Sequence, residues 1–226
     1  MTSSVIGQLI VKDWRLNGNL ISILVGVGLL ALVMAQYATG EAVRLFGSVW
    51  FFVSLGILAT MLPTSAILNE RKKQTLAFIM SLPVSPVQYA MAKGLSVAAM
   101  YLVPWVTLLA SALIFIETRH ALPLGVIPTL LIISMLPMVG FCLTSATVLV
   151  GESEGWLIAA NIATNSSYWF IWYLITRIPG LKQHWSGPVA VWNAPVLMVL
   201  SAEIGLCALI VAIAFFFQSR KRDFIH

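Results

Sequence analysis

Long apolar runs, separated by short polar connections, dominate the pattern along the chain. A helix needs about 20 mostly apolar residues to cross a bilayer. Unpaired strand edges are not stable in lipid, so such runs are expected to be helical. The pattern therefore predicts an all-α membrane protein, one transmembrane domain over residues 1–226. Its six predicted transmembrane helices cover residues 19–38, 46–68, 87–116, 124–150, 156–176 and 196–217.

Composition agrees with a membrane protein and argues against a soluble enzyme. Hydrophobic residues make up 60% of the 226 residues and charged residues only 9%, whereas a soluble domain carries roughly 25% charged residues. Cys142 and Cys207 lie inside apolar runs, which favours packing over a disulfide framework. The net charge of +5 gathers at the ends of apolar runs, so we interpret it as a topology signal and expect no nucleic-acid partner.

The distribution of Lys and Arg predicts the orientation of the chain. With six spans, both termini lie on one side, and nine of the 13 basic residues would lie there with them. Because cytoplasmic loops are enriched in Lys and Arg, we expect both termini in the cytoplasm and the chain as a multi-pass protein of the cell (inner or plasma) membrane. The nine residues are Lys12, Arg15, Arg71, Lys72, Lys73, Lys93, Arg220, Lys221 and Arg222.

Residues 1–18 show helical spacing of apolar side chains before the first span. Val5, Ile6, Leu9 and Ile10 would share a face, and Trp14 would sit at headgroup level. This pattern is typical of an amphipathic helix lying in contact with membrane lipid at the interface. A simple topogenic anchor would give the same pattern, and the two interpretations remain open.

Residues 69–85 form the most distinctive connection. A charged run, 70–73, precedes an apolar patch, 75–80, that is too short to span, and Pro83 and Pro86 limit the helices around it. Ser85 and Pro86 are suited to start the next helix as N-cap and first-turn residue. Such a surface fits docking to a cytoplasmic partner, although a membrane-hugging loop with topogenic charges fits it as well.

These motifs resemble the permease subunits of ABC-2 type exporters (a type V exporter-like fold). The resemblance also includes the Lys12-Asp13-Trp14-Arg15 stretch and the six-span plan, so that it covers the whole chain. The residues of the main motif are Glu70, Thr75, Leu76, Ser81, Leu82, Pro83, Val84, Ser85, Lys93, Gly94 and Leu95.

The resemblance implies that residues 70–83 are a coupling helix seated in a groove of a cytoplasmic ATP-binding subunit. Two copies of the permease, identical or homologous, would pair with two such ATPase subunits. The chain has no Gly-x-x-x-x-Gly-Lys-Ser/Thr phosphate loop, so ATP and Mg would be bound by the partner and this chain would hold no cofactor. The coupling residues would include Glu70, Arg71, Thr75, Leu76, Phe78 and Pro83.

Residues 177–195 form the longest outward connection, and it is rich in Trp, Pro and Gly. Trp185 and Trp192 suggest that the connection lies in the interfacial belt. The resemblance implies short re-entrant helices here, forming an external lid, although the segment is short for a full lid. A single interfacial anchor loop is the alternative.

Polar residues within the last two spans are candidates for lining a pathway. Asn161, Asn165 and Tyr168 are spaced to share one helical face, and Glu203 lies inside the last span. Charged groups inside a span are costly and usually face a bundle interior or water. We therefore expect these residues to line a pathway between two copies, with ordinary polar contacts between helices as the alternative.

The sequence lacks patterns for catalysis or metal binding, such as His-x-x-x-His, Gly-x-Ser-x-Gly or Cys-x-x-Cys, which argues against an enzyme. We expect the permease subunit of an ATP-driven exporter. An ion-coupled secondary transporter and a non-transporting accessory or immunity subunit are the alternatives. The substrate, its direction of movement and the identity of the second copy stay open.

Overall fold

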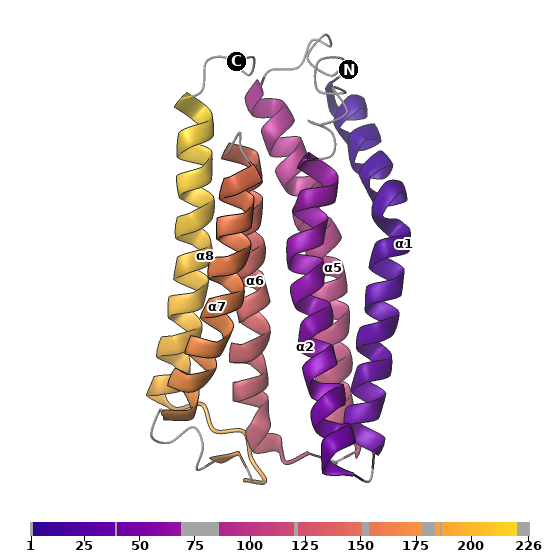
Figure 1. Cartoon of the computed structure of the whole chain (residues 1–226), viewed down its shortest axis with the longest axis vertical. Helices are drawn as coiled ribbons and strands as arrows, with labels where there is room; N and C mark the ends of the chain where they lie inside the picture. Colours follow the sequence, from indigo (N-terminus) through magenta and orange to yellow (C-terminus); the bar gives the residue numbers. More distant parts are fainter. Residues whose placement is uncertain are drawn as a thin grey trace.

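The computed structural model is a bundle of long helices that run roughly parallel to one another (Figure 1). It describes residues 2–38, 40–68, 86–119, 122–150, 154–177, 184–185 and 187–220. The elements are α1 (Thr2–Tyr37), α2 (Glu41–Pro63), the π-helical turn η1 (Thr64–Leu68), α5 (Pro86–Arg119), the 3-10 turn η2 (Leu124–Val126), α6 (Ile127–Val150), α7 (Glu154–Arg177) and α8 (Ala194–Arg220).

A helix covers each of the six predicted segments, so the all-α prediction is confirmed. Five stretches are long and apolar enough to cross a membrane. The helix outside this set is α7, whose 24 residues give a length of about 36 Å. Its composition is the reason, since Asn, Ser and Thr occupy its centre. Five membrane-spanning helices are therefore supported, and a sixth span at α7 stays a prediction.

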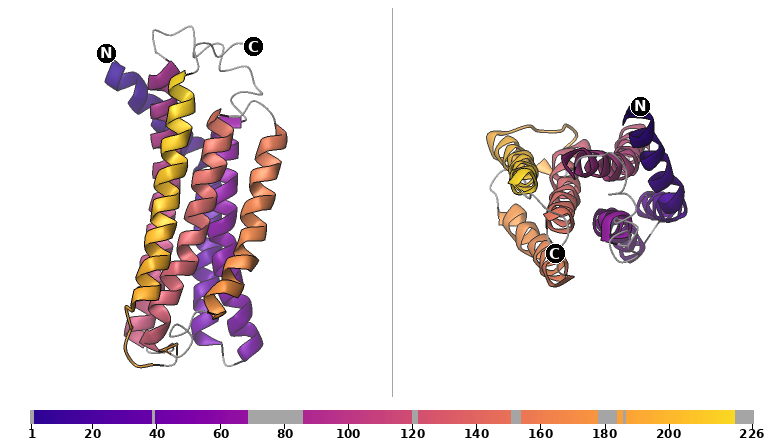
Figure 2. Two further views of the ribbon diagram at one scale, coloured as in Figure 1. Left: turned by 90° about the vertical axis from the view of Figure 1, so that its left-hand side faces the viewer. Right: turned by 90° about the horizontal axis from the view of Figure 1, so that it is seen from above.

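The N-terminal amphipathic segment and the first span form one helix. The 36 residues of α1 continue without a break for about 54 Å, which exceeds the roughly 30 Å of a bilayer's hydrocarbon core. The first turns lean away from the other helices (Figure 2). The beginning of α5 at Pro86 agrees with the helix start predicted there.

The helix α6 is the centre of the bundle. Seen from above, it lies between α7 and α8 on one side and α1, α2 and α5 on the other (Figure 2). Of its most apolar window 56% is buried, against 11% for α8. Most of α8 therefore faces outward, toward lipid or another chain.

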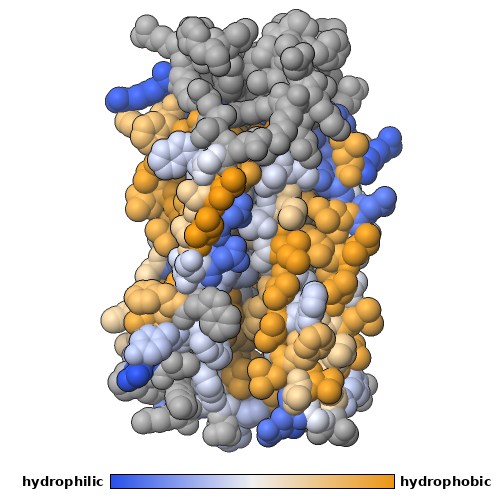
Figure 3. Space-filling model, in the orientation of Figure 1, coloured by the Kyte–Doolittle hydropathy of each residue, from blue (hydrophilic) through white to orange (hydrophobic). Residues whose placement is uncertain are grey.

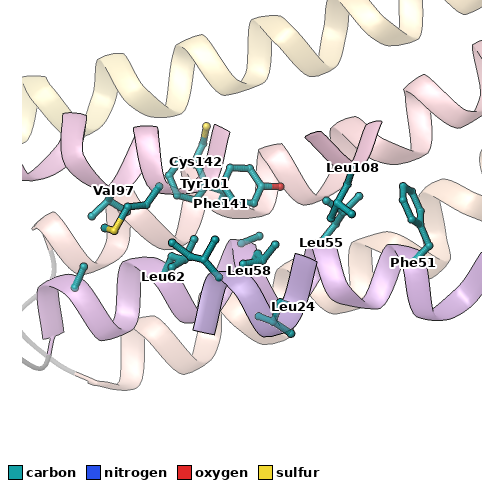
Figure 4. Packing of buried hydrophobic residues seen from close by; sticks show 14 of the residues in the cluster. Leu24, Phe51, Leu55, Leu58, Leu62, Val97, Tyr101, Leu108, Phe141 and Cys142 are labelled. Carbon is teal, nitrogen blue, oxygen red and sulfur yellow. The ribbon is translucent and has the colours of Figure 1, made fainter. Parts of the chain in front are cut away.

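The core lies between α1, α2, α5 and α6 (Figure 4). Leu55, Leu58 and Leu62 of α2 are completely buried. The rings of Tyr101 on α5 and Phe141 on α6 stack with centroids 4.3 Å apart. Because lipid tails are as apolar as these side chains, close packing must hold such helices together.

One glycine shows how close the helices approach. A Cβ added at Gly47 of α2 would lie only 2.6 Å from the backbone oxygen of Ala31 and the backbone nitrogen of Ala35, both on α1. Only a residue without a side chain fits at this contact. Small residues at helix crossings are typical of membrane bundles.

Candidate functional site

The predicted coupling segment lies outside the described residues, but the structure describes both of its flanks. Residues 69–85 follow η1 directly and precede α5. The predicted coupling residues Glu70, Arg71, Thr75, Leu76, Phe78 and Pro83 all fall in this range. The flanks lie at the same end of the bundle as the first turn of α1 and the last turn of α8 (Figure 1).

A buried ion pair joins α1 to α5 at this end. Lys93 Nζ donates to both carboxylate oxygens of Asp13, at 2.8 Å to Oδ1 and 2.7 Å to Oδ2. The two side chains are only 4% and 2% exposed. Ser96 Oγ, one turn along α5 from Lys93, donates to Asp13 Oδ2 at 3.2 Å. The carboxylate therefore accepts three hydrogen bonds, which offset its desolvation.

The same part of α1 also contacts η1. Asn17 Nδ2 donates to the backbone oxygen of Asp13 at 3.0 Å. Its amide oxygen, Oδ1, accepts a 2.6 Å hydrogen bond from Ser65 Oγ. We call Asp13, Asn17, Ser65, Lys93 and Ser96 the polar cluster. Through it, the element before residues 69–85 and the helix after them are both held to one turn of α1.

Sequence reasoning missed the polar cluster. The sequence predicted Lys93 as a charge at the cytoplasmic side, and Asp13 only as part of the Lys12-Asp13-Trp14-Arg15 stretch. Both instead lie buried between helices. Their separation of 80 residues gives no local signal. A single acid among the basic residues near the first span was the one available clue, since an unpaired buried charge is costly.

In the structure, the residues of the predicted polar face of α7 differ in their exposure. Asn161 and Tyr168 are half-buried, whereas Asn165 is exposed. A Cβ added at Gly140 of α6 would lie 2.5 Å from Thr164 Cγ2 and 3.5 Å from Tyr168 Oη, so this face of α7 packs against α6. Asn165 instead donates to the backbone oxygen of Asn161 at 2.8 Å.

The exposed part of α7 carries further polar groups. Ser166 and Ser167 are exposed near the middle of the helix, and Ser167 Oγ donates to the backbone oxygen of Ala163 at 2.6 Å. In the space-filling view, hydrophilic residues gather along the face where α7 lies, between strongly hydrophobic flanks (Figure 3). This face is less apolar than a lipid-facing surface usually is.

Glu203 is buried in α8, nine residues after its first residue Ala194. Neither carboxylate oxygen has a hydrogen-bond partner within the described part of the chain. One turn earlier, Val199 and Leu200 pack against a small buried cluster formed by Ile132 of α6 and Val196 of α8. The structure does not bring Glu203 into hydrogen bonding with Asn161, Asn165 or Tyr168 among the contacts it describes.

At the opposite end of the bundle, the connection between α7 and α8 makes a polar contact with α6. Trp185 Nε1 donates to Thr129 Oγ1 of α6 at 2.7 Å, and its ring stacks on Trp172 of α7. Gly125 N donates to Gly187 O at 3.1 Å. Trp185 is half-buried, while Trp192 is exposed. The described residues 187–193 are not helical. Residues 178–183 and 186 of the predicted re-entrant segment lie outside the described residues.

A cavity of about 500 Å³ lies between α5, α6 and α8, at the end of the bundle that carries the polar cluster. Its walls include small residues, among them Gly94, Ala98, Ala146 and Ala214, which leave the space unfilled. Within the described ranges, no group of three or more His, Cys, Asp or Glu side chains could hold a metal ion.

Comparisons were made with protein-family models, with characterised proteins and with solved structures. None of the three comparisons finds a match to this chain. The resemblance to ABC-2 permeases therefore stays a prediction from the motifs.

Proposed function

We propose that this chain is the membrane-spanning permease subunit of an ATP-driven exporter of the ABC-2 type. Two copies would form the pathway, and two cytoplasmic ATP-binding subunits would supply ATP hydrolysis. In this arrangement both termini and residues 69–85 face the cytoplasm. The chain itself performs no catalysis and lies in the cell membrane.

The observation that carries the proposal is the polar cluster. A segment that passes force from an ATPase to the membrane must be attached firmly to the helices that move. Ser65 and Lys93, on either side of residues 69–85, both bond to the same turn of α1. A displacement of the segment would thus move η1, α1 and α5 together. The Ser65–Asn17 hydrogen bond joins η1 to α1, and the buried, paired charges that join α1 to α5 separate only at high cost.

A second observation supports pairing of two copies. The helix α7 packs chiefly against α6, and it leaves Asn165, Ser166 and Ser167 exposed. Polar residues within a span usually face a bundle interior or water rather than lipid. A second copy against α7 and the mostly exposed α8 would give these groups such surroundings.

Affinity purification of the tagged chain from mild detergent tests the proposal. We expect a phosphate-loop ATPase to co-purify in equal amount. The double variant Glu70→Ala/Leu76→Asp should lose it, because the change removes a charge and breaks the apolar patch of residues 69–85. The matched control Glu41→Ala/Leu45→Asp makes the same changes at exposed positions of the opposite end and should retain it.

Recovery of the wild-type chain alone, under conditions that preserve membrane complexes, would contradict the proposal. Equal loss of the ATPase from both double variants would remove the coupling role from residues 69–85. Substrate-stimulated ATP hydrolysis by the complex separates an exporter from a non-transporting accessory or immunity subunit.

An ion-coupled secondary transporter is the second candidate, and Glu203 is the observation that favours it. A buried carboxylate without a partner in the described part of the chain is a common feature of proton-coupled proteins. Reconstituted vesicles distinguish the two mechanisms. Movement of substrate driven by a proton gradient, without ATP or an ATPase, would favour this candidate over the exporter.

A further inference from the structure

The cavity between α5, α6 and α8 has the form of a ligand site. Its volume of about 500 Å³ falls within the range of small-molecule pockets, roughly 300–1,000 Å³. The described residues that line it are almost entirely apolar and include no Asp, Glu, His, Lys or Arg. An apolar site of this size favours a neutral, largely hydrocarbon ligand.

The cavity extends along the helix axes of the bundle, from its end toward its middle. Gln218, two residues before the end of α8 at Arg220, lies with Met91 and Leu149 near the end of the bundle. Val211, Ala98 and Phe141 line the deeper part. Seven residues of helix separate Val211 from Gln218, which corresponds to about 10 Å. The cavity thus runs from the polar boundary of the bundle into its apolar interior.

Two polar side chains in the wall are left unsatisfied by the described residues. Gln218 is 6% exposed, and its Oε1 has no hydrogen-bond partner there. Ser145 Oγ is also buried without a partner, and both residues line the cavity. Buried polar groups are normally hydrogen-bonded. An acceptor at Gln218 Oε1 calls for a ligand that donates, such as a hydroxyl group.

We propose that the cavity binds a neutral, single-chain amphiphile with a hydroxyl-bearing head. Its head donates to Gln218 Oε1 and bonds Ser145 Oγ, while its hydrocarbon chain extends toward Phe141 and Val211. A monoacylglycerol has this chemistry. The apolar wall and the lack of charged lining side chains disfavour fatty acids and other charged heads. The proposal does not depend on the exporter function.

Photolabelling tests the proposal on the full chain in lipid nanodiscs. The probe is a monoacylglycerol with a diazirine in its acyl chain, and labelled peptides are identified by mass spectrometry. We expect label at the lining residues of α5, α6 and α8, competition by excess unlabelled monoacylglycerol, and at least several-fold weaker labelling by the matching fatty-acid probe.

Variants make the test specific. Gln218→Leu keeps a branched side chain of nearly the same size but removes the amide and with it the acceptor. It should lower labelling about five-fold, which corresponds to the loss of one typical hydrogen bond. Ala146→Phe fills the cavity and should abolish labelling there. Leu209→Phe places the same phenyl ring on the exposed face of α8, where Leu209 is 56% exposed, and should leave labelling unchanged. Thermal melting of each variant verifies folding.

Three results would overturn the proposal. Label spread evenly over the exposed faces of α7 and α8 would indicate general lipid contact. Equal labelling of the wild type and folded Gln218→Leu would remove the assigned head contact. Absence of label in the wild type would show that the cavity is filled by another part of the chain or by a second copy.

Discussion

Replacing Lys93 by methionine removes the ammonium group from the polar cluster while it keeps most of the side chain's length. Asp13 would then keep the 3.2 Å hydrogen bond from Ser96 but lose both bonds from Lys93 Nζ. Because the two side chains are only 4% and 2% exposed, water cannot readily take the place of the lost partner. Removal of one partner from a buried pair costs about 3–5 kcal/mol.

The double variant Asp13→Leu/Lys93→Met should behave differently from the single variant. It removes both charges and fills the site with apolar groups of similar volume. Such replacements are often neutral or stabilising. We therefore expect its free energy of unfolding to return to within about 1 kcal/mol of the wild type. The two changes are non-additive because the residues are in direct contact.

The measurement is reversible unfolding of the purified chain in mixed micelles, by titration with SDS and circular dichroism. Arg15→Met is the matched control, because it removes a positive charge from an exposed position of α1 and should change the free energy of unfolding by no more than about 0.5 kcal/mol. A Lys93→Met variant as stable as this control would refute the reasoning. A double variant as unstable as the sum of its single variants would do so too.

Three further predictions concern packing and polar contacts. Gly47→Ala should lower the free energy of unfolding by about 1–3 kcal/mol, because the new Cβ would overlap the α1 backbone. Gly56→Ala on the same helix is the control and should leave the free energy of unfolding unchanged, since a Cβ there would have nothing within 4 Å. Equal destabilisation by both variants would contradict the close approach of α1 and α2 at Gly47. Trp185→Phe should cost about 1 kcal/mol in the same titration by removing the bond to Thr129, and no loss would show that the contact is dispensable. Glu203→Gln should lower ATP hydrolysis by the co-purified complex without lowering expression, and unchanged hydrolysis would remove Glu203 from the mechanism.

The positions of the helices were predictable because lipid leaves few choices. A chain segment in hydrocarbon must satisfy its own backbone, so an apolar run of sufficient length becomes a helix. The helix start at Pro86 was predictable because proline lacks an N–H that the first turn does not need. The boundary expected after residue 18 was not a helix boundary, since residues 1–19 contain no proline and α1 continues through it.

The sequence by itself determined an all-helical membrane protein, the location of its helices and the polar content of α7 and α8, because these depend on local composition and spacing. Tertiary structure alone decided that Asp13 meets Lys93, that Asn165 faces outward while Tyr168 faces α6, and that small residues on α5, α6 and α8 border a cavity. These features depend on how helices rotate and pack against one another. That choice is made by contacts between residues far apart in the chain, which no local pattern records.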